Sequence, residues 1–400
     1  MPTRKGALAG VRVLDLTRNT AGLFCTMILA DLGAEVIMIE PRQITPRTIG
    51  RFLVSRRNVD GLDMRTLHTH RSKKSLTLEI KSPQGQEVFR DLVRISDVVV
   101  NNYRPGVMEA LELDHPRLVD INPRIISCSI TGFGPSGPYR NRPGFDFIAQ
   151  GMSGLMMRTG EAGSPPLFPG VPVADLGTAM FAAHGILAAL YARERTGRGQ
   201  EVSACLLNTS LALLYADGTY FLNTGIEPAR SGTKHWALPL AGVYATRDGH
   251  IVICPISEQQ VRGLLRAVGK EAVLQEPRFS SPGLRAEHKQ ELDSLAEEAF
   301  LSNTTAYWLE RLEKEDVPAG PVNTVAQAFA DPHILQGKMV ASVPYKNRKY
   351  RLLGNPIQMS DGAADHSPPP TWGEHTEEIL AGLLNYSPER IAALRQEKLV

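Results

Sequence analysis

Apolar and polar positions alternate between two periods through the first third of the chain. Short apolar runs such as GVRVLDLT (10–17) and AEVIMIE (34–40) predict buried strands, and AGLFCTMILADLG between them predicts a helix that ends at Gly33. The cycle then continues with predicted strands at 74–80, 97–102 and 124–134 and predicted helices at 82–96 and 107–123. Strands that alternate with helices predict an α/β fold with a parallel, doubly wound sheet.

The pattern changes twice further along the chain. Residues 145–225 are rich in predicted helix, and GVYATRDGHIVICPIS after them predicts a hairpin with RDG as its turn. Beyond 331 we expect extended chain at 352–360 and a final helix at about 374–382, packed back on the first domain. The predicted domains are therefore 1–225, an inserted smaller α+β domain at 226–330, and a returning segment at 331–400.

Composition narrows the class of protein. A chain of 400 residues with 42% hydrophobic residues and a net charge of +2 is typical of a globular protein and lacks the concentrated positive charge of nucleic-acid binding. Cys25, Cys128, Cys205 and Cys254 form no CxxC pair, which argues against a zinc site and fits a reducing cytoplasm. No signal sequence and no uncharged bilayer-spanning segment is expected, so we predict a cytoplasmic protein without a membrane partner.

Candidate chemistry should follow the strands, because ligands of open α/β sheets bind beyond the carboxyl ends of the strands. The turns expected there are 17–22, 40–42, 101–106 and 131–137. Glu40 stands where dinucleotide-binding domains keep a ribose-binding acid, but TRNTAG has one glycine instead of GxGxxG. The sequence therefore gives little support to a nicotinamide enzyme.

Charged and histidine-rich stretches leave two questions open. A group of basic residues is either a solvated surface or a site for the phosphates of coenzyme A, and it comprises Arg42, Arg71, Lys73, Lys74, Lys81 and Arg104. His68 and His70 have no carboxylate or cysteine partner at a spacing typical of metal sites, and His184 lies in an apolar helix. We expect no metal. No GxSxG motif is present, so serine hydrolase chemistry is not favoured.

Asp175 precedes the long apolar run GTAMFAAHGILAALYARER. Aspartate is a favoured helix N-cap, so capping accounts for the residue by spacing alone. The alternative is a nucleophile, because a helix N-terminus would hold the carboxylate ionised and ready to attack.

Many ordered motifs resemble those of the family III CoA-transferases, the CaiB/BaiF family that includes formyl-CoA transferase, carnitine CoA-transferase and the related α-methylacyl-CoA racemases. They include LAGVRVLDLT, AGLFCTMILADLGAEVIMIEP, SDVVVNNYRPGVMEAL, NPRIISCSITGFGPSGPYRNRPGFDFIAQ, VPVADLGTAMFAAHGILAALYARERTGRGQEV and GEHTEEIL. The resemblance implies a large Rossmann-like domain built from both ends of the chain, a small inserted domain, and an interlocked homodimer.

The resemblance also implies a reaction. Asp175 would attack the thioester of an acyl-CoA to form a mixed anhydride, returning thiolate would give an aspartyl-CoA thioester, and an incoming carboxylic acid would take the CoA. Acyl-CoA and a small carboxylic acid are then the substrates, with no bound cofactor and no metal.

The family's binding residues map onto this chain position by position. The matching residues are Asn19, Thr20 and Ala21 in the first turn, Leu78 and Lys81 on the adenine and phosphate side, Asn102, Tyr103 and Arg104 along the nucleotide, and Phe145 and Asp146 near the thioester. Pro41 occupies the place of a phosphate-binding arginine, with Arg42 one position away, and Ala110 replaces another; Arg104 is expected to compensate.

Two departures bear on the substrate. The racemases place a histidine where this chain has Phe145, which cannot transfer a proton, so transfer is favoured over racemisation. The glycine-rich loop of formyl-CoA transferase is replaced by KHWALPLAG, which argues against formate and oxalate. Lys234 and His235 in that stretch suggest a larger acid, such as a dicarboxylate exchanged with succinyl-CoA.

Overall fold

A computed structural model describes residues 6–43, 58–360 and 366–400. The chain divides into two compact units, each described here by itself. The first contains Met1–Leu155, Pro169–Gly218 and His333–Val400, and the second contains Met156–Phe168 and Thr219–Pro332. The boundaries expected at 226 and 330 compare with 219 and 332, and a short segment before the helix of Asp175 joins the second unit.

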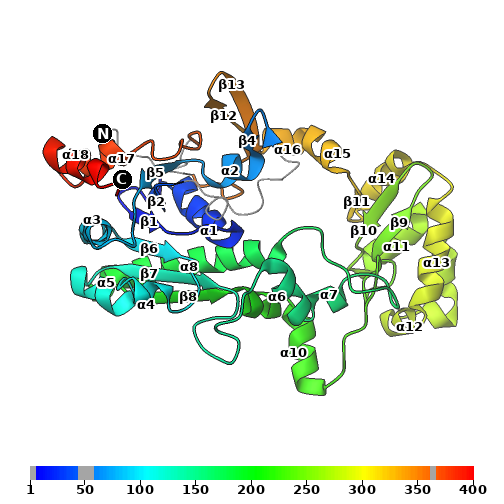
Figure 1. Ribbon diagram of the computed structural model, residues 1–400. Coiled ribbons are helices and arrows are strands. Elements are labelled where there is room, and N and C mark those ends of the chain that lie inside the picture. Colours follow the sequence, from blue (N-terminus) through cyan, green and yellow to red (C-terminus); the bar gives the residue numbers. More distant parts are fainter. Residues whose placement is uncertain (1–5, 44–57, 361–365) are drawn as a thin grey trace. The chain divides into compact units, whose positions relative to one another are not determined.

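The first unit is built on a six-stranded parallel sheet, which confirms the predicted sheet type (Figure 1). Its strands are β1 (Arg12–Asp15), β2 (Glu35–Glu40), β5 (Lys73–Thr77), β6 (Val98–Asn101), β7 (Ile126–Thr131) and β8 (Glu201–Cys205). Their spatial order is β5-β2-β1-β6-β7-β8. Counted along the chain this is 3-2-1-4-5-6, the order of dinucleotide-binding domains. The order reverses between β1 and β6, which is the switch point of the sheet.

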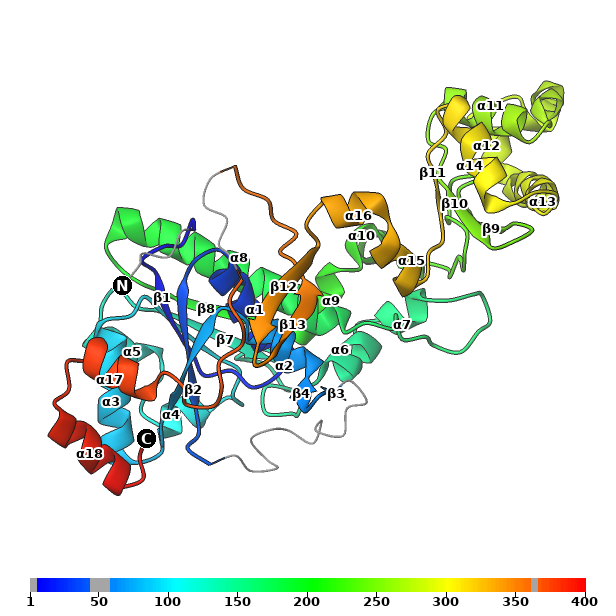
Figure 2. The same ribbon diagram turned by 90° about the horizontal axis from the view of Figure 1, so that it is seen from above.

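Helices cover both faces of this sheet, as Figure 2 shows. On one face Val13, Val36 and Val98 pack against α1 (Thr20–Asp31) and α8 (Val173–Thr196). On the other face, residues including Leu14, Ile37 and Val99 pack against helices that come from the middle and the end of the chain: α3 (Pro83–Arg94), α5 (His115–Ile121), α17 (Thr376–Gly382) and α18 (Pro388–Gln396). The last two helices close the core on the second face.

Smaller elements complete the first unit. They are β3 (Asn58–Val59), β4 (Leu62–Asp63), α2 (Met64–Thr69), α4 (Val107–Ala110), α6 (Asp146–Met152), α9 (Leu206–Ala212), α16 (Pro332–Gln336), β12 (Val340–Tyr345) and β13 (Arg348–Leu353). The chain passes between the units in α7 (Leu155–Arg158) and α10 (Tyr215–Thr224).

The second unit has a three-stranded antiparallel sheet with helices around it. Its elements are β9 (Gly242–Ala245), β10 (His250–Ile253), β11 (Ala319–Pro321), α11 (Glu258–Ala267), η2 (Glu271–Gln275), η3 (Pro277–Phe279), α12 (Pro282–Glu287), α13 (Lys289–Phe300), α14 (Thr305–Lys314) and α15 (Val325–Ala330). β9 and β10 form the predicted hairpin. Tyr244, Ile251 and Phe300 belong to the separate core of this unit.

Two expectations are wrong in detail. The stretch predicted as extended at 352–360 contributes only the end of β13, which pairs antiparallel with β12. The helix near 374–382 is not the last, because Ser387 caps α18 and Pro388 begins it. Helix α8 has 24 residues and contains an 18-residue stretch with a mean hydropathy of 1.5, so by length and composition it could cross a membrane. Half of that apolar stretch is buried in the protein, as in a core helix.

Candidate active site

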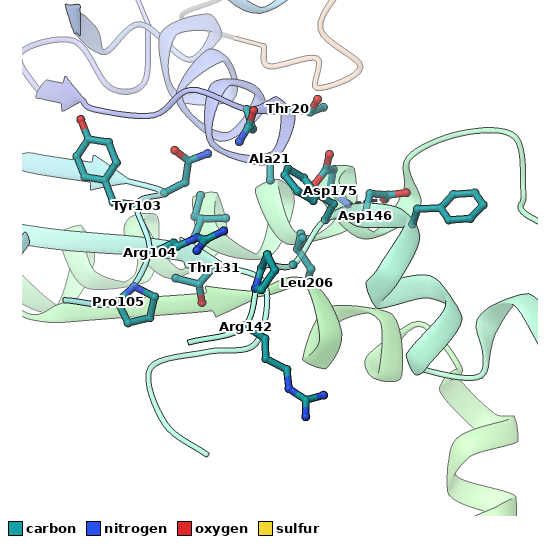
Figure 3. Close-up of a pocket in the computed structure, with 18 of the residues that line it drawn as sticks. Thr20, Ala21, Tyr103, Arg104, Pro105, Thr131, Arg142, Asp146, Asp175 and Leu206 are labelled. Atoms are coloured by element: carbon teal, nitrogen blue, oxygen red, sulfur yellow. Dashed lines mark hydrogen bonds between the residues drawn. The ribbon is translucent and has the colours of Figure 1, made fainter. Parts of the chain in front are cut away.

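A cavity of about 400 Å³ lies beyond the carboxyl ends of the strands, at the switch point (Figure 3). Nine of the twelve residues predicted for the site line it: Asn19, Thr20, Ala21, Asn102, Tyr103, Arg104, Phe145, Asp146 and Asp175. They come from the turns after β1, β6 and β7 and from the first turn of α8. A ligand in this cavity would contact four segments that are far apart in the sequence.

The turn after β1 is held by a buried carboxylate. Asp15 Oδ1 accepts hydrogen bonds from the main-chain N–H and the hydroxyl of Thr17, at 2.9 and 2.7 Å. Gly22 packs so closely on Thr17 that a Cβ there would lie 2.4 Å from the threonine Cβ. Asn19 precedes α1 and makes no side-chain capping bond. The first N–H groups of α1 are therefore placed at the cavity, where they favour an anion.

A direct hydrogen bond links the turns on the two sides of the switch point. The side-chain oxygen of Asn102 accepts from the main-chain N–H of Arg18 at 3.0 Å. Asn101 Oδ1 accepts from the N–H of Tyr103 at 3.3 Å and shapes the second turn. The Asn102 side chain therefore holds the two turns together at the ends of β1 and β6.

The long loop after β7 returns to the cavity through two glycines. A Cβ on either Gly132 or Gly144 would lie 2.7 Å from the Cα of the other, so the two backbones touch. This contact delivers Phe145 and Asp146 to the cavity at the start of α6. Glycine is required at both positions because any side chain would push these two segments of the loop apart.

Asp175 does not cap its helix, so the capping hypothesis is wrong. The N-cap of α8 is Pro172, and Asp175 is the third residue inside the helix. The main-chain N–H of Asp175 instead donates to Asp146 Oδ1 at 3.0 Å. The Asp146 carboxylate on α6 thus accepts a hydrogen bond from the first turn of α8, and the Asp175 carboxyl group lies at the cavity wall (Figure 3).

The surroundings of Asp175 oppose the ionised state that was expected from its place near a helix N-terminus. Burial, and then the negative charge of Asp146, raise the pKa of Asp175 to about 7. Both causes act against the charged form of the carboxyl group. Loss of the negative charge, whether by protonation or by acylation, therefore stabilises this carboxyl group in its surroundings.

Sequence reasoning missed several residues at the site. Arg65, Arg140 and Arg142 also line the cavity and add positive charge to that of Arg104. Gln150 is fully buried, and its Nε2 donates to Asp146 Oδ2 at 2.6 Å. The spacing of four between Asp146 and Gln150 on one predicted helix was the available signal for this pair.

Three predicted contacts are not at the cavity. Leu78 is 1% exposed and packs in the core, Lys81 is exposed before α3, and Arg42 follows β2 without lining the cavity. Within the group of basic residues, Arg71 pairs with Asp31 and Lys73 with Asp15, in both cases with buried side chains. Those two cations stabilise the fold and are not placed to bind phosphate.

The surroundings of Lys234 do not support its suggested role in binding a dicarboxylate. Its ammonium group pairs with Glu297 at 2.9 Å and lies 3.2 Å from the centre of the Tyr244 ring, all within the second unit. Nδ1 of His235 accepts main-chain hydrogen bonds from Ala237 and Leu238. Both side chains are therefore used locally, and the choice of a dicarboxylate needs another basis.

The histidines singled out in the sequence are also accounted for by their surroundings. Burial lowers the pKa of His68 to about 4 and that of His70 to about 3, which keeps both rings neutral near pH 7. No group of three potential metal ligands occurs in residues 6–43, 58–360 and 366–400.

Comparison with known proteins gives the family. The model of "CoA-transferase family III" matches residues 8–376. Succinyl-CoA:glutarate CoA-transferase of Homo sapiens is 34% identical over 97% of this chain and 88% of its own, and formyl-CoA:oxalate CoA-transferase of Streptomyces coelicolor is 33% identical over 98% and 99%. A CaiB/BaiF family protein from Brucella suis has a similar structure, with a TM-score of 0.82, 33% identity and 95% and 100% coverage. The chain belongs to CoA-transferase family III, and it is a CoA-transferase.

Proposed function

We propose that the chain moves CoA from an acyl-CoA to a carboxylic acid through covalent intermediates on Asp175. The observation that carries the proposal is the Asp175 carboxyl group itself, which is half-buried at the wall of the switch-point cavity and has its pKa raised to about 7. Burial removes water that would otherwise hydrolyse an activated acyl group. Above pH 7 the group is mostly an unsolvated carboxylate, which is a competent nucleophile.

The reaction proceeds by exchange of acyl bonds. An Asp175 oxygen attacks the thioester carbonyl and the C–S bond breaks. The CoA thiolate departs, and a mixed anhydride of Asp175 and the donor acid remains. The thiolate attacks the Asp175 carbonyl and releases the donor acid, giving an aspartyl-CoA thioester. The acceptor carboxylate attacks this thioester, and the freed thiolate then takes the acceptor's acyl group and regenerates Asp175. Donor, acceptor and CoA balance without a metal or a redox step.

The turn after β1 supports this chemistry by its position. The N–H groups at the start of α1, in Thr20 and Ala21, lie at the same cavity as Asp175. A helix N-terminus stabilises negative charge. We assign to it the thiolate and the tetrahedral oxyanions, and to Arg104, Arg140 and Arg142 the phosphates of CoA.

We propose a dicarboxylate acceptor with succinyl-CoA as the donor. The support is the similarity to a succinyl-CoA:glutarate CoA-transferase together with the cationic wall of the cavity. The relatives that act on oxalate are similar to nearly the same degree, so the panel of acids in the test includes glutarate, succinate, oxalate and formate.

The test of the mechanism uses succinyl-CoA and acetyl-CoA with this panel and follows new acyl-CoA by mass spectrometry. Asp175→Ala is expected to abolish exchange, and hydroxylamine is expected to trap a modification on Asp175 of the native enzyme. Full exchange by Asp175→Ala would exclude the mechanism. Incorporation of α-deuterium into a 2-methylacyl-CoA in deuterated water, without an acceptor, would instead indicate racemase activity.

We also propose an interlocked homodimer in the cytoplasm. Large apolar side chains are exposed on α10, among them Tyr215 at 85% and Leu222 at 82%. Phe181 and Tyr191 on α8 are more than half exposed. An apolar surface of this kind is expected to be covered by another protein surface. Sedimentation equilibrium of the native chain tests the number of subunits.

A further inference from the structure

Gln150 is a fully buried residue that contacts Asp146, one of the residues at the cavity. It lies on α6, four residues after Asp146, and does not line the cavity. Its Nε2 donates to Asp146 Oδ2 at 2.6 Å, while Asp146 Oδ1 accepts the main-chain N–H of Asp175 at 3.0 Å. Two donors from different helices therefore hold the two oxygens of one carboxylate.

Stability alone does not explain a glutamine at this position. Its second polar atom, Oε1, is buried and has no hydrogen-bond partner among the described residues. A buried unsatisfied polar atom costs about 1–3 kcal/mol, and an apolar side chain of similar size would avoid this cost. What the amide provides despite that cost is the hydrogen bond from its Nε2 to Asp146, whose other oxygen contacts the backbone of Asp175.

We propose that Gln150 is a positioning residue for CoA transfer, because it holds the Asp146 carboxylate beside Asp175 and so keeps a negative charge next to the nucleophile. The inference rests on the function proposed above. When Asp175 attacks a thioester, its charge passes to the CoA thiolate as the C–S bond breaks. The anhydride left beside Asp146 is neutral, so repulsion in the free enzyme is relieved by acylation.

The charges around the pair agree with this role. Asp146 is a cause of the raised pKa of Asp175, second to burial. Among the described residues, the other charged groups at the cavity are the cations Arg65 on α2, Arg104 after β6, and Arg140 and Arg142 in the loop after β7. Without Gln150 the Asp146 side chain can rotate towards these cations, and its effect on Asp175 is lost.

The test is a double-mutant cycle in the full-length enzyme with Gln150→Leu, Asp146→Asn and the pair combined, assayed with succinyl-CoA and the best acceptor. Gln150→Leu is expected to lower kcat about tenfold to a hundredfold with KM for acyl-CoA within about twofold. Its pH midpoint for kcat is expected to fall, because the repulsion on Asp175 is weaker. The combined variant should be no slower than Asp146→Asn, since Gln150 acts through Asp146.

Matched variants keep the outcome clear. Ser153→Ala removes another buried hydrogen bond to the same helix, to the carbonyl of Gln150, and should leave kcat and the pH midpoint unchanged. Gln150→Met replaces the amide if the leucine variant melts early. Additive losses in the cycle, or an unchanged pH midpoint, would overturn the inference while Asp175 still becomes labelled. Full exchange by Asp175→Ala would instead overturn the proposed function.

Discussion

At the scale of single residues, the chemistry depends on two carboxyl groups that the fold forces together. Asp175 must be ionised to attack a thioester, and its pKa is raised to about 7 by burial and by Asp146. We therefore expect kcat/KM for acyl-CoA to rise with pH through about 7 and then level off. Asp146→Asn removes the second cause but not the burial, so it should move this midpoint to lower pH. A midpoint that stays in place would show that burial alone raises the pKa.

The same carboxyl group should destabilise the folded chain. Its pKa is higher folded than unfolded, so between about pH 4 and 7 the folded chain keeps a proton that the unfolded chain has released, and stability falls as pH rises through this window. Asp175→Asn should therefore be more stable than the native chain at pH 8 by roughly 2 kcal/mol, about half of what a fully buried carboxyl group with this pKa would give, because Asp175 is only half-buried. The difference should vanish near pH 4. Urea titrations at the two pH values measure it, with Asp120→Asn, at an exposed position on α5, as the control.

Residue identities alone could predict the nucleophile but not its surroundings. Motifs pointed to Asp175, and strand ends pointed to Asn19 and Asn102 at the cavity. Local spacing was misleading, because an aspartate before an apolar run, such as Asp175, resembles a helix cap. The hydrogen bond to the start of α8 comes instead from Asp146 on another helix. Lys234 likewise looked available and is paired with Glu297. Such partners depend on tertiary contacts, which a sequence does not display.

At the scale of elements, the site depends on where helices begin. The alternation of strands and helices predicted the parallel sheet, and the sheet order places the ends of β1 and β6 side by side. The edge strand β8 and the hairpin of β12 and β13 were missed. β8 is short and partly exposed, so it carries no long apolar run, and its identity follows from pairing with β7.

The loop after β7 gives a prediction for this scale. Gly144→Ala would place a Cβ 2.7 Å from the Cα of Gly132, so the loop must shift and carry Asp146 away from α8. We expect a loss of about 2 kcal/mol in stability and at least a tenfold loss in kcat. Gly283→Ala is the matched control, since that helical glycine has nothing within 4 Å of the added Cβ and should be neutral or slightly stabilising. Unchanged kcat in Gly144→Ala would show that the glycine contact does not position Asp146.

At the scale of the whole molecule, the apolar surface of α8 needs an explanation. One side of this helix packs Ala179, Ala182 and Ile186 against the sheet, while Met180 and Phe181 point away and are about half exposed. A helix that is apolar on both sides is expected to have both sides covered. The exposed side of α8 is therefore the surface that the proposed dimer is expected to cover.

Phe181→Glu tests this directly. A charge on the exposed side of α8 leaves the packing on the sheet intact but cannot be buried against another subunit without a large desolvation penalty. We expect the native chain to sediment as a dimer and Phe181→Glu to dissociate at low micromolar concentration, with activity falling in parallel. Arg198→Glu, at an exposed position just after the same helix, controls for a change in surface charge. A native chain that sediments as an active monomer would show that α8 is exposed in the working enzyme and that one chain holds the complete site.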